Sequence, residues 1–196
     1  MRTLLSYQNK KLGEDVASFA LPTTVCKLRN IKHQGCNKYC YAKKMENIWK
    51  PVRIKWRWNL KQSLRKDFLI MMKAELTLSR KKIIRVHVGG DFYNQKYLDL
   101  WLRLANEFPK KTFFTYTKAV DLDFSKRPKN FKILFSDDSY IFKNHHDKFD
   151  GVAVIKEFVQ NKVTHKSKGW SLCPGDCRSC NKCWATKRPL IIFHKH

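Results

Sequence analysis

Seven cysteines form two groups at opposite ends of the chain, at spacings that suit metal ligation. The C-terminal group lies in "SLCPGDCRSCNKCW" and has the spacing Cys-x3-Cys-x2-Cys-x2-Cys. The N-terminal group lies in "VCKLRNIKHQGCNKYCYAKK" and has the spacing Cys-x9-Cys-x3-Cys. The seven candidate metal ligands are Cys26, Cys36, Cys40, Cys173, Cys177, Cys180 and Cys183.

The C-terminal group favours an iron–sulfur cluster. Its overlapping two-residue gaps suit a [4Fe–4S] cube, whose corners need several thiolates from one short loop. Pro174 and Gly175 permit the tight bends that such a loop requires. A tetrahedral zinc site more often takes two spaced pairs from separate knuckles. Zinc is therefore the alternative metal at this group.

The N-terminal group offers three thiolates, which would leave one iron of a cube without a protein ligand. An open iron can bind a substrate or cofactor, as an incomplete catalytic metal site does. Two other divisions stay open: one cluster with one zinc ion, or a single cluster that takes ligands from both groups. We therefore expect one or two clusters, with three and four ligands as the working division.

The redox state of the thiols follows from their number and context. Seven is an odd number, and the N-terminal "MRTLLSYQNKK" lacks the apolar stretch of a secretory signal. A disulfide framework is therefore disfavoured, and we expect reduced thiols in a cytoplasmic compartment. No run of about 18 apolar residues is present, so no membrane partner is expected.

The charge of the chain is strongly basic, with 41 Lys and Arg against 16 Asp and Glu. A polyanion, most commonly nucleic acid, is the expected partner of such a surface. Residues 43–66 carry nine basic residues and one acid, interleaved with tryptophans, as in grooves that hold single strands. The alternative is an amphipathic helix with buried tryptophans and solvated lysines. The candidate nucleic-acid contacts are Lys43, Lys44, Trp49, Arg53, Arg57 and Trp58.

Hydrophobic periodicity predicts an α/β fold with a parallel sheet. Apolar residues recur at helical steps over about 56–79, and a second helix is expected from its cap at Asn94 to Pro109. Short apolar runs predict strands, the last of them at an edge. The expected strands are 15–22, 83–88, 112–117, 131–136, 151–155 and 190–193.

Strands alternating with helices at this spacing pair in parallel, and ligands then bind beyond the carboxyl ends of the strands. The first cysteine group and the strings "GGDF", "TYTK" and "FSDDS" all follow predicted strands, so we expect them at one rim. The predicted organisation is an α/β core over 1–165, with a cluster loop at 21–50, and a cysteine-rich segment over 166–196 packed on that core.

Further candidates for cofactor contact at this rim are His87, Asp91, Tyr116 and Lys118. His87 is either a buried core histidine or a ligand. Asp91 could cap the next helix, bind a cofactor amine or hold an arginine. Strand alternation turns Tyr116 and Thr117 to opposite faces. Lys118 could neutralise a carboxylate or phosphate, or be one surface lysine among many.

The strings "QGCNKYCYAKK", "RVHVGGDFYNQKYLDLWLRLANEFP", "FFTYTKA" and "CPGDCRSCNKCW" resemble the largely phage-borne family called gene product eighty-eight. The resemblance covers the chain from about Asn9 to Trp184. The family name implies no particular reaction.

A more distant resemblance is to radical S-adenosylmethionine enzymes. Their cluster loop, like this one, is preceded by glycine and ends in "CYA", and a later Gly-Gly-Glu motif holds the amino group of the cofactor. Here Gly89, Gly90 and Asp91 stand at the matching place, with Asp for Glu, and the loop spacing is nine and three where the family has three and two. The resemblance implies a small partial (βα) barrel, S-adenosylmethionine as cofactor and an extra C-terminal cluster.

Two functions follow as hypotheses. The first is an iron–sulfur, radical-SAM-like redox enzyme that acts on a nucleic acid or nucleotide. The alternative is a zinc-stabilised, non-catalytic module of phage origin that binds nucleic acid through its basic surface.

Overall fold

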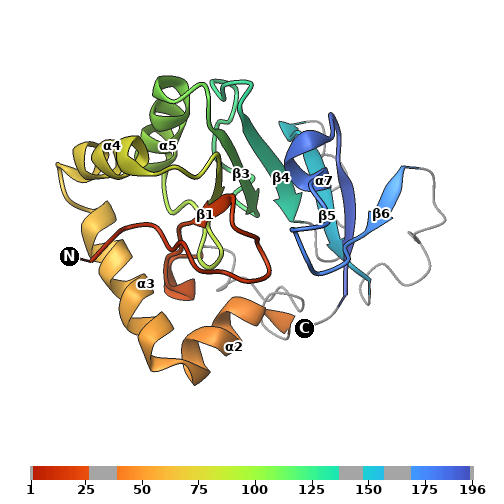
Figure 1. Cartoon of the computed structure of the whole chain (residues 1–196), viewed down its shortest axis with the longest axis horizontal. Coiled ribbons are helices and arrows are strands. Elements are labelled where there is room, and N and C mark those ends of the chain that lie inside the picture. Colours follow the sequence, from red (N-terminus) through yellow and green to blue (C-terminus); the bar gives the residue numbers. More distant parts are fainter. Residues whose placement is uncertain (1, 27–38, 137–147, 157–168, 195–196) are drawn as a thin grey trace.

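The chain folds around a seven-stranded sheet in which every strand pairing is parallel (Figure 1). This computed structural model describes residues 2–26, 39–136, 148–156 and 169–194. The strand order is β1-β2-β3-β4-β5-β7-β6, so five consecutive strands are neighbours before the order reverses. The strands are β1 (Val16–Ser18), β2 (Ile83–Val86), β3 (Thr112–Thr117), β4 (Phe131–Ser136), β5 (Gly151–Ile155), β6 (Trp170–Leu172) and β7 (Leu190–Phe193). The predicted α/β class with a parallel sheet is confirmed.

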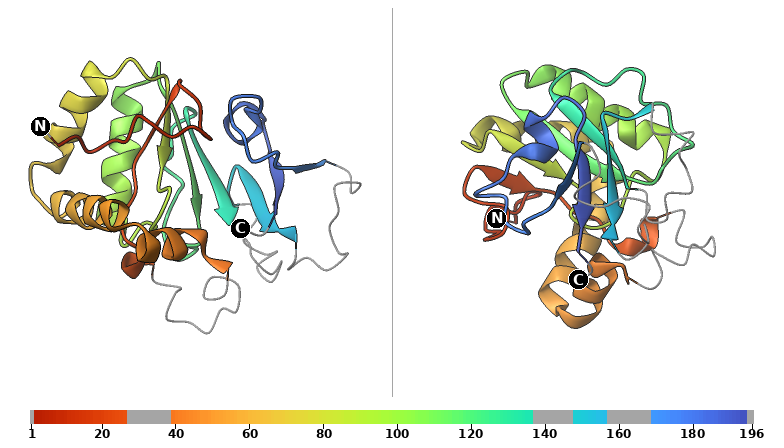
Figure 2. Two further views of the ribbon diagram at one scale, coloured as in Figure 1. Left: turned by 60° about the horizontal axis from the view of Figure 1, so that its bottom comes forward. Right: turned by 90° about the vertical axis from the view of Figure 1, so that its right-hand side faces the viewer.

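The long helices all lie between residues 41 and 107 and gather on one side of the molecule (Figure 2). None of the helices in the described ranges is long and apolar enough to cross a membrane. The helices are η1 (Thr23–Val25), α2 (Tyr41–Ile48), α3 (Lys50–Ser63), α4 (Phe68–Leu78), α5 (Gln95–Glu107) and α7 (Lys182–Ala185).

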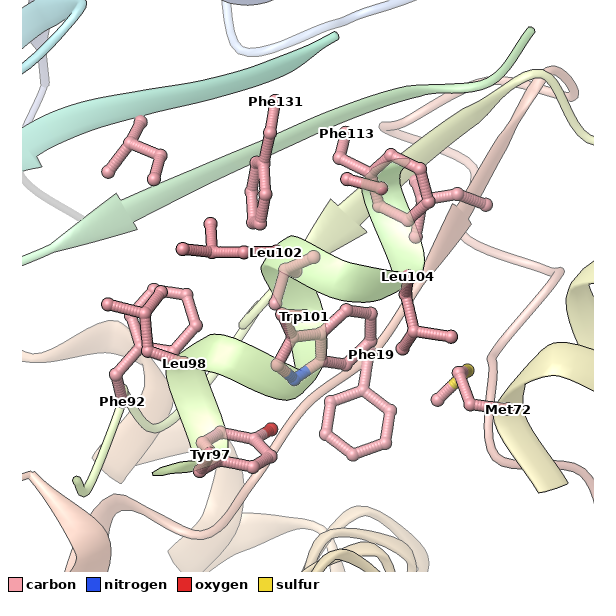
Figure 3. Packing of buried hydrophobic residues seen from close by; sticks show 14 of the residues in the cluster. Phe19, Met72, Phe92, Tyr97, Leu98, Trp101, Leu102, Leu104, Phe113 and Phe131 are labelled. Carbon is pink, nitrogen blue, oxygen red and sulfur yellow. The ribbon is translucent and has the colours of Figure 1, made fainter. Parts of the chain in front are cut away.

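The larger core lies between the sheet and the helices α4 and α5. Trp101 of α5 is fully buried at its centre, 5.2 Å from the ring of Phe19 (Figure 3). Strand alternation sends Phe113 of β3 into this core and Phe114 to the opposite face of the sheet. That opposite face carries a smaller core, where α7 lies against β3 and β4. Both faces of the sheet are therefore covered, as parallel sheets require.

Several predicted elements are confirmed. The strands at 112–117, 131–136 and 151–155 have the predicted bounds. Asn94 caps α5, because its Oδ1 accepts a hydrogen bond of 2.8 Å from the amide of Tyr97.

Other predicted boundaries were wrong. The helical pattern predicted for 56–79 is two helices, α3 and α4, with a break after Ser63, and α3 begins earlier, at Lys50. The strand predicted to reach residue 88 ends at Val86, because His87 has a φ of 63°, which leaves the extended conformation. The strand at 190–193 is not at an edge, since the unpredicted β6 pairs with its outer side.

The loops that follow β1 and β2 are in close contact. The amide of Leu21 donates a hydrogen bond of 2.8 Å to the carbonyl of Gly89. Gly90 has a φ of 78°, and a Cβ there would lie 2.6 Å from Cβ of Leu21. Only glycine fits both the left-handed backbone and this approach. The two loops are thereby held together at the carboxyl-end rim of the sheet.

A matched pair of substitutions separates the effect of backbone strain from that of crowding. Gly169 has a similar φ of 85°, but its added Cβ would meet only Leu190 Cδ1 at 3.5 Å, an ordinary contact. We expect Gly169→Ala to lower the free energy of unfolding by about 1 kcal/mol. Gly90→Ala should lower it by about 3 kcal/mol, because overpacking is added to strain. Urea denaturation measures both, and equal losses would contradict the close approach.

Candidate metal centre

The four C-terminal cysteines lie on the α7 side of the sheet, within and beside the smaller core. Cys173 follows directly after β6, and Cys183 lies in α7, where it is buried. Cys173, Cys177 and Cys183 contact this core together with Phe114 and Tyr116 of β3. Strand β6, the intervening loop and α7 therefore bring the thiols to the middle of one sheet face.

The loop between Cys173 and Cys183 makes contacts of the kind that surround metal-bound thiolates. Sγ of Cys173 accepts a hydrogen bond of 3.4 Å from the amide of Gly175, and amide bonds to sulfur of this kind tune iron–sulfur sites. The amide of Cys177 donates to the carbonyl of Lys11 at 2.7 Å. The loop is thus tied at Cys177 to the segment before β1.

The thiols influence one another electrostatically. Burial raises the pKa of Cys177, and the neighbouring thiols of Cys173 and Cys180 raise it further. Burial raises the pKa of Cys183 to about 11, although a hydrogen bond with the Tyr116 hydroxyl opposes the rise. All four cysteines are free of disulfides. A metal bound here would replace thiol protons at neutral pH.

Arg85 of β2 points to the same face and is the cation that acts on the thiols of Cys177 and Cys183. Its Nη2 donates a hydrogen bond of 3.1 Å to the hydroxyl of Tyr41, and its guanidinium lies 5.4 Å from the centre of the Tyr116 ring. Burial lowers the pKa of Arg85, but these two phenols and the thiols of Cys177 and Cys183 raise it, and the net result is a raised pKa. Its buried Nε has no partner among the described residues, and no carboxylate in those ranges pairs with it.

The thiols are neighbours but do not form a closed ligand set. Within residues 2–26, 39–136, 148–156 and 169–194, no three Cys, His, Asp or Glu side chains are close enough together to hold a metal ion. The residue types and the positive charge of Arg85 fit a thiolate-ligated metal, whose site would be negatively charged. The four-cysteine set is therefore chemically suited to a metal but open in shape.

Two of the three N-terminal cysteines lie on adjacent elements, and Cys36 lies outside the described residues. Cys26 ends η1, and Cys40 caps α2, with its Sγ accepting a bond of 3.4 Å from the amide of Lys43. The two elements are joined by the buried Glu46, whose Oε2 accepts from the amide and hydroxyl of Thr23 at 2.9 and 2.8 Å.

Tyr41 connects the N-terminal cysteine segment to the C-terminal one. It follows Cys40 directly, and its hydroxyl bonds both the carbonyl of Val88 and the guanidinium of Arg85. Arg85 in turn lies over the ring of Tyr116, which packs against the smaller core that contains Cys183. A path of side chains from Tyr41 through Arg85 to Tyr116 therefore runs between the two segments across β2 and β3.

Part of the expected rim is present where β2, β3 and β4 end, and residues 137–139 of "FSDDS" lie outside the described residues. The carboxylate of Asp91 accepts hydrogen bonds from Thr117 Oγ1 at 2.7 Å, from the amide of Lys118 at 2.8 Å and from the amide of Phe92 at 2.7 Å. The ammonium of Lys118 bonds Ser136 at the end of β4. Burial raises the pKa of Asp91, and the three hydrogen bonds oppose the rise. Both oxygens of Asp91 are thus engaged by the chain itself, and Thr117 and Tyr116 point to opposite faces as predicted.

His87 lies inside the larger core. Its ring is 4.6 Å from Phe92, and its Nε2 is 3.0 Å from the hydroxyl of Tyr97. Nδ1 has no partner within the described residues. Burial lowers the pKa of His87 to about 3, so the ring is neutral at physiological pH. Of the two roles that the sequence allowed for His87, these surroundings match the buried core histidine.

The predicted nucleic-acid contacts lie on α2, on α3 and at their junction. Trp49, between the two helices, is 54% exposed. Trp56 is buried, and the ring of Trp58 is covered by the cations of Arg2 and Lys55, at 5.6 and 5.0 Å from its centre. Lys44 and Arg57 are exposed, whereas Lys43 and Arg53 are half-buried.

Sequence reasoning missed Arg85 and Tyr41. Arg85 interrupts the run "KIIRVHV", and a charged residue between the buried Ile84 and Val86 of a parallel strand is unusual enough to have been a signal. Tyr41 carried no such signal, because its partner Arg85 is 44 residues away in the sequence.

Comparison with known proteins identifies relatives in phages. A family model described as Gene product 88 matches residues 3–186. The Gene 88 protein of Mycobacterium phage L5 is 30% identical over 118 residues, which cover 53% of this chain and 49% of that protein. The Gene 88 protein of Mycobacterium phage D29 is 28% identical over 118 residues, with the same coverage. The chain spans about half the length of these curated relatives.

No solved structure matches the chain. The resemblance to a phage family is confirmed, whereas the resemblance to radical S-adenosylmethionine enzymes, and the barrel-like closure that it implied, receive no support.

The buried His87 predicts a pH dependence of stability. Its pKa is 6.5 when exposed and about 3 in the fold, so the unfolded chain takes up a proton first as the pH falls. Its contribution to stability is complete above about pH 6.5 and is progressively lost below it. At about pH 4.5 the loss should be about 2.5 kcal/mol relative to neutral pH.

His87→Asn should remove this component, because asparagine accepts the positive φ without titrating. Urea denaturation at about pH 7.5 and about pH 4.5 gives the difference, and His194→Asn is the matched control that should retain it. An unchanged pH dependence in His87→Asn would contradict the assignment.

Proposed function

We propose, from the premise that the chain belongs to the Gene product 88 family, that this protein binds a [4Fe–4S] cluster through Cys173, Cys177, Cys180 and Cys183. In this proposal it is a redox protein. A bound cluster supplies one-electron transfer. The residues of the chain hold the cluster, balance its charge and shield it from water.

The observation that carries the proposal is the guanidinium of Arg85. A largely shielded cation normally has an anionic partner, because an unpaired charge away from water is costly. The described part of the chain offers Arg85 no carboxylate, but it does offer phenols and thiols. A centre ligated by four thiolates is negative overall and would supply the missing anion.

The smaller core supports a cluster in the same place. Phe114 and Trp184 lie beside the cysteines with ring centres 4.9 Å apart, and they exclude water from that side. Tyr116 packs against the same core, and the Gly175 amide donates a hydrogen bond to Sγ of Cys173. Hydrogen bonds to the sulfurs and an apolar shell are the means by which a protein sets the potential of an iron–sulfur centre.

Cys26, Cys36 and Cys40 are proposed as a second ligand set. The two hydrogen bonds that Thr23 donates to Glu46 support this part, because they hold η1 to α2. Cys26 follows η1, and Cys40 caps α2. The path through Tyr41 and Arg85 would link the two sets electrostatically. A role for S-adenosylmethionine stays a prediction from resemblance and is not part of the proposal, since both oxygens of Asp91 already have partners.

Metal analysis tests the proposal directly. Protein purified without oxygen should be brown, contain iron and acid-labile sulfide, and absorb broadly near ~400 nm, as thiolate-ligated iron clusters do. Cys180→Ser should lose most of this iron and absorbance. Ser179→Ala, in the same exposed loop, is the matched control and should keep them. A colourless protein with stoichiometric zinc, or one without metal, would refute the cluster.

If Arg85 balances the charge of a bound cluster, its removal should have opposite effects in metal-free and in cluster-loaded protein. In metal-free protein, Arg85→Met should leave the free energy of unfolding unchanged or raise it by up to about 1 kcal/mol, because it removes a poorly compensated charge. In loaded protein the same change should speed loss of the cluster to a chelator roughly tenfold, since the negative centre loses its counter-charge.

Arg85→Lys is the control, because it keeps the charge and should preserve most of the retention. Denaturation of the metal-free protein and decay of the cluster absorbance provide the two measurements. A loss of stability in metal-free protein with unchanged retention would mean that Arg85 is only a structural cation.

A further inference from the structure

One side of α3 carries a straight row of cations. Lys50, Arg53, Arg57 and Lys61 follow one another at steps of three, four and four residues, which places them on the same side of a helix. Lys50, Arg57 and Lys61 are exposed, and Arg53 is half-buried. The opposite side of α3 is buried. At a rise of about 1.5 Å per residue the row is about 16 Å long.

The row is not neutralised by the surrounding structure. Glu46 is the one acid in residues 43–66, and it is buried and occupied by Thr23. Among the described residues no acidic side chain pairs with a member of the row. Lys55 is outside the row and is used internally, with its ammonium over Trp58 and burial lowering its pKa to about 8. Lys50, Arg57 and Lys61 therefore face solvent. The guanidinium of the half-buried Arg53 donates a hydrogen bond to the carbonyl of Asn47, at 3.5 Å.

An aromatic and apolar platform lies at the start of the row. Trp49 immediately precedes α3 and is 54% exposed, and Ile48 beside it is 61% exposed. Trp56 and Trp58 cannot serve in this way, because one is buried and the other is covered by cations of its own chain. Trp49 is thus the open indole of the described α2–α3 segment.

We propose that α3 binds single-stranded nucleic acid, with the phosphate backbone along Lys50, Arg53, Arg57 and Lys61 and an unpaired base stacked on Trp49. A linear row of cations complements a linear polyanion, whereas a membrane surface would not require the charges to be in line. Stacking on an exposed indole requires a base that is free of its partner strand, which favours single strands over duplexes. Helix α3 lies among the helices at one side of the molecule (Figure 2). The proposed binding surface therefore does not depend on the metal centre.

Fluorescence anisotropy with a labelled oligothymidylate of about 20 nucleotides tests the proposal. The wild-type chain should bind in a salt-dependent manner between about 50 and about 200 mM salt. Lys50→Gln/Arg57→Gln should bind about tenfold more weakly at low salt, and the slope against log salt should fall by about 1.4, the value for two lost phosphate contacts. Trp49→Ala should weaken binding about tenfold and Trp49→Phe much less, since phenylalanine still stacks.

Arg80→Gln/Lys82→Gln is the matched control, because it removes the same charge from exposed positions between α4 and β2. It should retain nearly wild-type affinity. Equal losses in the two double variants would mean diffuse electrostatic attraction and would overturn the proposal. So would a duplex bound as tightly as the single strand, or Trp49-dependent binding to phosphatidylglycerol vesicles without binding to the oligonucleotide.

Discussion

The position of one guanidinium organises the candidate centre of this protein. Arg85 lies on the α7 side of the sheet, bonded to Tyr41 and stacked over Tyr116, and the thiols of Cys177 and Cys183 are the other acidic groups that affect it. A cation so placed is costly unless an anion comes close to it. The same charge favours the thiolate form of the cysteines, and thiolates are the form that binds metals. The half-buried position of Arg85 and the gathering of the cysteines thus support one another.

The parallel sheet makes this arrangement possible. Parallel pairing puts the ends of β2, β3 and β4 at one rim, where Asp91, Thr117, Lys118 and Ser136 are bonded together. The polar groups at this rim are therefore occupied by hydrogen bonds to one another. The sheet face with α7 is left to carry the thiols, and the long helices are held to the other side. The chemistry that we propose is therefore placed in the middle of a sheet face rather than at the rim that the sequence indicated.

The separation of a buried side from an exposed side on α3 also explains the basic surface of this helix. Helix α3 buries Trp56 on one side and presents its row of cations on the other. With Glu46 engaged by Thr23, the helix pair retains an unbalanced positive charge. The metal centre and the cationic row thus occupy different parts of the molecule and are supported by different observations.

The sequence alone determined the α/β class, most strand positions, the cap at Asn94 and the seven thiols, because these follow from local periodicity and residue type. It also indicated that Tyr116 and Thr117 face opposite ways, since strand alternation is a local property. Only the tertiary structure decided that His87 lies in the core, that Asp91 is engaged by Thr117 and the Lys118 amide, and that Arg85 faces the cysteines. Those pairings join residues far apart in the chain. They depend on strand order and on which elements cover each face of the sheet, and no local pattern encodes either.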